Sequence, residues 1–239
     1  LASCDGVSFF ACDHETSKAY EHILARHISI IPTPFIDTRK YQPCSPSKNK
    51  KIVLYLGDVK ATKGFLALPK LLEEIVNQEQ NEDVSYLIQY SLTNKSEEFL
   101  AVDKTLKKFA EVHPNIDVYE VFWSEQQLHT ILASCHALVF NYDSSVYMYQ
   151  SSGVLWLAAY YNLKMFFLSN NWLTREAARL KSEYTLCDPN KIVECLNELS
   201  HGDINKQTDY ANIRSPSGAD YNTKLFGDFG KWLSSIVVP

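Results

Sequence analysis

The stretch Ile52-Val-Leu-Tyr-Leu-Gly-Asp-Val-Lys-Ala-Thr-Lys-Gly-Phe65 decides the fold. It begins with five apolar residues, the length of a buried strand, and this strand is expected to end at Gly57. A short polar loop follows, and an amphipathic helix is expected to begin at Lys63-Gly64. The ammonium group of Lys63 is expected to be solvated. The apolar side of that helix is Phe65, Leu68, Leu72 and Ile75. Strand, loop and helix in this order predict one unit of a parallel α/β sheet.

The same pattern continues on both sides of this stretch. Further strand candidates are Val7 to Ala11, Ile28 to Ile31, Val84 to Gln89, Ile116 to Phe122, Ala137 to Asn141, Met165 to Leu168 and Tyr184 to Cys187. Amphipathic segments lie between them, and helix starts are marked by the capping box Ser124 with Gln127 and by Asp188-Pro189. The alternation predicts an α/β fold, a Rossmann-like parallel sheet with helices on both faces, six-stranded between residues 52 and 187.

Composition divides the chain into three parts. Residues 1–50 hold a short strand-helix-strand unit, too small to fold alone, and a proline-rich hinge that starts at Pro32. Residues 51–200 are the Rossmann-like domain. Residues 201–239 are expected to form a polar loop and a closing helix from Tyr221 to Val238, weakened by Gly227 and Gly230.

Charge and length exclude several classes of protein. The 239 residues carry 23 Lys and Arg against 28 Asp and Glu, a net charge of -5 without a basic cluster that would offset it, which argues against nucleic-acid binding. There is no run of about 18 apolar residues and no signal-peptide layout, so the expected location is cytoplasmic. The six cysteines form no C-x-x-C pair and are expected to be reduced, mostly buried thiols.

Two segments have the chemistry of an oxyanion site. Gly57, Asp58, Lys63 and Gly64 surround a strand-loop-helix junction, where free backbone N–H groups and a lysine can hold a phosphate, although the P-loop and G-x-G-x-x-G patterns are absent. An ordinary surface turn is the alternative. The second segment is Ser151-Ser152-Gly153, a helix start whose N–H groups can bind either a serine cap or an anion.

Aromatic residues are concentrated near these segments. Trp123, between Phe122 and Ser124, could stack on a base, but packing at a strand end is the alternative interpretation. Trp156 and the pair Tyr160-Tyr161 lie in an apolar helix and are predicted to belong to the core.

The order of segments resembles the C-terminal, donor-binding lobe of GT-B retaining glycosyltransferases, the group 1 or glycogen-synthase-like family. Residues 4–43, with Ile-Pro-Thr-Pro-Phe-Ile-Asp, resemble that family's exit from its acceptor lobe. Residues 52–65 resemble its G-R-x-x-x-x-K-G element, and 121–128 its nucleobase loop. Gln150-Ser-Ser-Gly-Val-Leu-Trp-Leu-Ala-Ala resembles a Q-S-G-V-x-x-L-A donor-phosphate helix start.

This chain departs from the family pattern at several of these positions. Asp58 stands where the family has an arginine that clamps the donor diphosphate, which leaves Lys63 as the cation. The family's glutamate pair falls near Tyr149 and Leu157, so neither carboxylate is present. Among the histidines of the leading segment, no motif identifies a catalytic residue. The catalytic residue therefore stays unassigned.

The resemblance implies transfer of a sugar from a nucleotide-diphosphate donor, with Gly57, Asp58, Lys63, Gly64 and Ser151 to Gly153 at the phosphates and Phe122 to Ser124 at the nucleobase. It implies no cofactor and, since no D-x-D pair occurs, no metal. The partners would be a nucleotide sugar, an acceptor lobe outside this chain and a glycan, lipid or protein acceptor; peripheral membrane association stays open. The alternatives are a non-catalytic GT-B-like binding module and another nucleotide-sugar-binding protein such as an epimerase.

Overall fold

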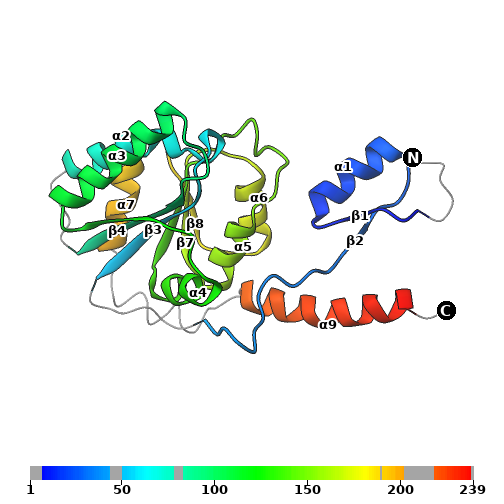
Figure 1. The fold of residues 1–239 in the computed structure, drawn as a ribbon. Coiled ribbons are helices and arrows are strands. Elements are labelled where there is room, and N and C mark those ends of the chain that lie inside the picture. The colour runs from blue at the N-terminus through cyan, green and yellow to red at the C-terminus, as the bar shows by residue number, and fades with distance from the viewer. Residues whose placement is uncertain (1–6, 44–49, 78–82, 189, 202–217, 238–239) are drawn as a thin grey trace.

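The computed structural model describes residues 7–43, 50–77, 83–188, 190–201 and 218–237 (Figure 1). The central strands are β3 (Lys51–Asp58), β4 (Val84–Ser91), β5 (Ile116–Glu120), β6 (Ala137–Phe140), β7 (Lys164–Phe167) and β8 (Tyr184–Leu186). They form one sheet in the order β5-β4-β3-β6-β7-β8, and all neighbours are parallel. The predicted six-stranded parallel sheet is confirmed.

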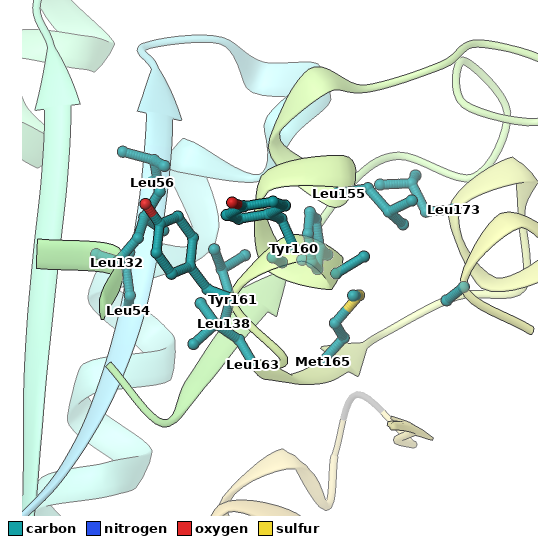
Figure 2. Packing of buried hydrophobic residues seen from close by; sticks show 14 of the residues in the cluster. Leu54, Leu56, Leu132, Leu138, Leu155, Tyr160, Tyr161, Leu163, Met165 and Leu173 are labelled. Atoms are coloured by element: carbon teal, nitrogen blue, oxygen red, sulfur yellow. The ribbon is translucent and has the colours of Figure 1, made fainter. Parts of the chain in front are cut away.

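Helices cover both faces of this sheet, as predicted (Figure 1). One face carries α2 (Leu68–Asn77), α3 (Glu97–Val112) and α7 (Ile192–His201). The other carries α4 (Glu125–Ser134), α5 (Gly153–Tyr160) and α6 (Trp172–Arg179), whose packing is seen in Figure 2. The capping box of Ser124 and Gln127 starts α4, as the sequence predicts.

Strand β3 shows why the sheet needs two layers of helices. Val53 and Tyr55 are buried against α2, whereas Leu54 and Leu56 are buried on the opposite face. A strand that is apolar on both sides must be covered on both sides. Burial of each such aliphatic side chain contributes about 1.5–3 kcal/mol, so β3 anchors both cores.

The leading residues form a second, smaller unit. Here β1 (Phe10–Ala11) and β2 (Ser29–Ile30) form a parallel pair, and α1 (His14–Leu24) connects them. Asp13 caps α1 by accepting from Thr16 N over 2.9 Å, and Ser17 Oγ donates to Ile28 O over 2.7 Å. The predicted strand-helix-strand pattern is therefore present, with strands shorter than the sequence suggests.

The hinge is packed despite its linker-like composition. Helix α9 (Gly218–Val237) presents buried Asn222, whose Oδ1 accepts from Phe35 N over 2.8 Å and whose Nδ2 donates to Ile36 O over 2.8 Å. Tyr160 of α5 donates its hydroxyl to Tyr41 O over 2.6 Å. The segment before residue 44 is thus held between α5 and α9, and the far end of α9 meets the leading unit.

Several sequence expectations need correction. The helix after β3 begins at Leu68 rather than at Lys63, because two 3-10 turns, Ala61–Lys63 and Phe65–Ala67, come first. Helix α7 begins at Ile192, so Asp188 is not its cap; Pro189 lies outside the described residues, as does the predicted polar loop over 202–217.

The cysteines and the helices add two observations. Cys12, Cys135, Cys187 and Cys195 are free thiols, and burial raises the pKa of Cys135 to about 12, which makes it a core residue rather than a nucleophile. In the described part of the chain, no helix is both long enough and apolar enough to cross a bilayer.

Candidate functional site

The strand order locates the site. From β3 the chain moves to β4 and β5 in one direction, then returns to β6 beside β3 and continues to β7 and β8 in the other. The carboxyl ends of β3 and β6 therefore border a topological switch point, where the following loops diverge to opposite faces of the sheet. Ligands of open α/β sheets bind in the crevice at this position.

Gly64 joins the two loops at the switch point. Its φ is +76°, in the left-handed region, and a Cβ there would lie 2.0 Å from Asn141 O. Asn141 directly follows β6, and its Nδ2 donates to Gly64 O over 3.3 Å, while Asp143 N donates to Thr62 O over 2.9 Å. Only glycine allows this approach, so Gly64 fixes the position of Lys63 relative to β6.

Lys63 lies across the end of β3. A Cβ on Gly57 would lie 3.3 Å from Lys63 Cδ and 3.6 Å from its Nζ, so Gly57 leaves space for the lysine stem. The Lys63 side chain is only 15% exposed, and its Nζ lies 3.6 Å from Asp58 Oδ2. Lys60 Nζ lies 3.5 Å from the same oxygen. The prediction that the Lys63 ammonium is solvated is therefore wrong, because Asp58 pairs with it.

The start of α5 is an open array of backbone donors. Its N-cap residue, Ser152, is buried but makes no side-chain cap bond to any residue that the structure describes. A Cβ on Gly153 would have no neighbour within 4 Å, so the first residue of α5 faces open space. Free N–H groups at an uncapped helix start attract anions.

Tyr142 lies between the two groups of predicted residues. Its side chain is 4% exposed, and its hydroxyl has no hydrogen-bond partner within the described ranges. Burial raises the pKa of Tyr142, and nearby Asp58 raises it further, whereas Ser152 lowers it without reaching hydrogen-bond geometry. An unpaired buried hydroxyl costs stability and is a donor ready for a ligand oxygen.

Two more tyrosines line the base of this region. Tyr55 donates its hydroxyl to Lys63 O over 3.1 Å, and the ring of Tyr147 lies 4.5 Å from that of Tyr142. Burial raises the pKa of both Tyr55 and Tyr147, and the charge of Asp58 adds to the rise at Tyr147. Both phenols therefore stay neutral, and the site's charge comes from Lys60, Lys63 and Asp58.

The predicted nucleobase segment lies farther along the sheet, at the end of β5. Phe122 is 82% exposed, Trp123 is buried, and Ser124 caps α4. Trp123 belongs to the core, as the packing interpretation holds, yet it also borders a hollow of about 450 Å³ beside β5 and α4. The hollow is lined by Tyr119, Val121, Trp123, Gln126, Gln127, Thr130 and Ile131. This lining carries no charge, so the hollow suits a neutral group rather than a phosphate.

Candidate acid-base groups are sparse near the switch point. Tyr149, in the family's glutamate position, is 71% exposed, and Leu157 packs on the core of the α5 face. His27 pairs with Glu21 over 2.6 Å inside the leading unit. Among the described residues, no three His, Cys, Asp or Glu side chains come together as metal ligands.

Sequence reasoning missed Asn141 and Tyr142. Both directly follow a buried strand, which is a usable signal once β6 is placed beside β3. That adjacency depends on the strand order, and no local pattern encodes it.

No family model matches this chain, and no curated protein does. The structure, in contrast, matches solved structures over most of its length. One is the C-terminal domain of LpcC, a group 1 family glycosyl transferase from Francisella tularensis, with 14% identity, a TM-score of 0.53, and coverage of 79% of this chain and 97% of that one. The fold is that of the C-terminal lobe of a GT-B glycosyltransferase.

Two other neighbours of this GT-B-type lobe are longer proteins. Sucrose-phosphate synthase from Thermosynechococcus elongatus matches with 12% identity and a TM-score of 0.61 over 95% of this chain and 57% of its own. A putative UDP-N-acetylglucosamine 2-epimerase from Listeria monocytogenes matches with 14% identity and a TM-score of 0.51 over 74% and 43%. The chain spans about half the length of these two proteins, and the likeness establishes the fold alone.

Proposed function

We propose that this chain is the donor-binding lobe of a glycosyltransferase that transfers a sugar from a nucleoside diphosphate with retained configuration. The single observation that carries the proposal is the buried Tyr142 hydroxyl, which lies between Lys63 and the uncapped start of α5 and has no hydrogen-bond partner among the residues that the structure describes. A lysine, a phenol and backbone N–H groups meet at the switch point, and within the described ranges Asp58 is the carboxylate that pairs with this lysine. A diphosphate would supply acceptors for all of these donors.

The chemistry would be electrostatic. Breaking the bond between sugar and diphosphate leaves negative charge on the phosphate oxygens, and preorganised donors that face this charge lower the barrier. Lys63 supplies a full charge, α5 a partial charge and Tyr142 a neutral donor. We propose that these groups replace a divalent metal. The acceptor and the residues that contact it would belong to a lobe outside this chain, possible partners being a glycan, lipid or protein.

A second candidate is a non-catalytic binding module, and Asp58 is the observation that favours it. Its carboxylate adds a like charge beside any bound phosphate and pairs with both lysines of the loop. An epimerase is the other alternative on this architecture, because one neighbour of the fold has that description.

Nucleotide titration tests the proposal. UDP, GDP and their sugars are added at 1 mM to the chain in EDTA, and the melting temperature is followed. A Kd of about 0.1 mM would stabilise the fold by about 1.4 kcal/mol, or roughly 3 °C for a chain of this size. The absence of a shift with every nucleotide would favour the binding module, and a shift that required Mg²⁺ would contradict the metal-independent site.

A further inference from the structure

The leading unit contacts the Rossmann-like domain at the first turn of α6. The indole Nε1 of Trp172 donates to Asp13 Oδ1 over 3.4 Å, with both side chains buried. Arg175 forms a fork with Glu15: its Nε lies 2.8 Å from Oε1 and its Nη2 lies 2.7 Å from Oε2. A bidentate pair of this kind fixes the plane of the guanidinium as well as its position.

The same turn of α6 also holds the loop that leads into α5. We call residues 141–152 the site loop, because it carries Tyr142, Tyr147 and Ser152. Trp172 N donates to Tyr147 O over 3.0 Å, and Arg175 Nη2 donates to Met148 O. Arg175 therefore uses one nitrogen for both partners, a carboxylate on the leading unit and a carbonyl on the site loop.

The geometry makes the two contacts interdependent. With Glu15 in place, the guanidinium plane is set by two bonds, and its Nη2 is directed at Met148 O. The hydrogen bond to Glu15 raises the pKa of Arg175, so the guanidinium stays charged. Without Glu15, the Arg175 side chain, which is 37% exposed, regains rotamer freedom. This gain in conformational entropy opposes formation of the bond to Met148 O.

We propose that Arg175 is a positioning residue that couples docking of the leading unit to the conformation of the site loop. Glu15 orients the guanidinium, the guanidinium holds the Met148 carbonyl, and the loop then places Ser152 and the start of α5. What the loop binds rests on the proposed function, but the coupling is a property of the chain itself.

Amide hydrogen exchange of the full chain tests the coupling. Glu15→Gln removes the charge of the pair, and exchange in the site loop is expected to rise about twofold to fivefold, the range of a half-exposed ion pair. The matched control is Glu21→Gln, on the same helix, because the hydrogen bonds that Glu21 makes to described residues, those to His27 and to Ile28 N, stay within the leading unit. Exchange in the site loop should not change in this control.

Arg175→Lys separates charge from geometry. Lysine keeps the charge near Glu15 but loses the fork, so the site loop should exchange faster even with the leading unit docked. Unchanged exchange of the site loop in both Glu15→Gln and Arg175→Lys would overturn the proposal. The proposal would also be overturned if Glu21→Gln accelerated amide exchange in the site loop as much as Glu15→Gln does.

Nucleotide affinity gives a second readout. If the wild-type chain binds UDP or GDP, Glu15→Gln should weaken binding by about the same twofold to fivefold, and equal affinity would contradict the positioning role. If the wild-type chain binds neither nucleotide, the proposed function fails, while the exchange comparison still decides whether the coupling exists.

Discussion

Removing the charge of Asp58 should strengthen nucleotide binding. The carboxylate lies 3.5 Å from Lys60 Nζ and 3.6 Å from Lys63 Nζ, so it pairs with the lysines that a phosphate would contact. Asp58→Asn keeps the shape of the side chain and removes this competition. Asp58→Arg adds the second cation of the resembled family and should strengthen binding further.

The size of the effect follows from the distances. A phosphate oxygen hydrogen-bonded to Lys63 Nζ would lie about 6 Å from Asp58 Oδ2, since Nζ and Oδ2 are 3.6 Å apart. Coulomb's law gives about 0.7 kcal/mol of repulsion at a dielectric constant near 80 and about 2.8 kcal/mol near 20. The Asp58 side chain is 41% exposed, so the lower half of this range applies, and affinity should rise about threefold to twentyfold.

Calorimetric titration with UDP and GDP at low and high salt measures this gain. The gain should shrink as salt rises, because the repulsion is partly screened. Asp117→Asn is the matched control, since it removes the same charge from an exposed position on β5, and it should leave affinity within twofold. Equal binding by Asp58→Asn would contradict the competition, and weaker binding would show that Asp58 contributes to the binding site.

Three further predictions concern the fold. Gly64→Ala should lower the free energy of unfolding by about 2–4 kcal/mol in urea, because its Cβ would meet Asn141 O at 2.0 Å at a positive φ, whereas Gly153→Ala, with open space around its Cβ, should cost less than about 0.5 kcal/mol. Asn222→Ala leaves two hinge N–H groups and a carbonyl unpaired and should cost about 2–4 kcal/mol, with faster amide exchange at residues 35 and 36. Burial would raise the pKa of Asp13, but hydrogen bonds from Thr16 and Trp172 lower it in the folded protein. The stabilisation by Asp13 is therefore present above the ordinary carboxyl pKa of about 3.9 and is lost as pH falls through the lower pKa of the folded state. Asp13→Asn should remove this contribution to the loss of stability in acid, and an unchanged dependence of stability on pH would contradict the prediction.

The sheet could be predicted because its information is local. Each strand is a short apolar run, each helix has its own periodicity, and Ser124 with Gln127 is a complete start signal within four residues. The start of α5 at Gly153 is local in the same sense. The helix after β3 was placed too early because Gly64 takes a left-handed turn, and that turn depends on Asn141, which follows the neighbouring strand β6 and is 77 residues away in sequence.

The hinge and the polar centre of the site were not predictable in this way. Phe35 and Asn222 are 187 residues apart, so the composition of the hinge gives no sign that it is packed. Asp58 could be read as a lost cation, but its pairing with Lys63 depends on how the loop folds back over Gly57. Tyr142 is one of 14 tyrosines, and only the structure singles out its unpaired hydroxyl.

Calorimetric titration of Lys63→Ala beside wild type tests the donor site most directly. Wild type should bind UDP or GDP in EDTA, and Lys63→Ala should weaken that binding by about 1.5–3 kcal/mol, roughly tenfold to 150-fold. Lys60→Ala is the control, since its side chain is 56% exposed against 15% for Lys63, and its loss should stay within about threefold. Equal binding by wild type and Lys63→Ala, or no binding by wild type at millimolar nucleotide, would contradict a donor phosphate site at the switch point.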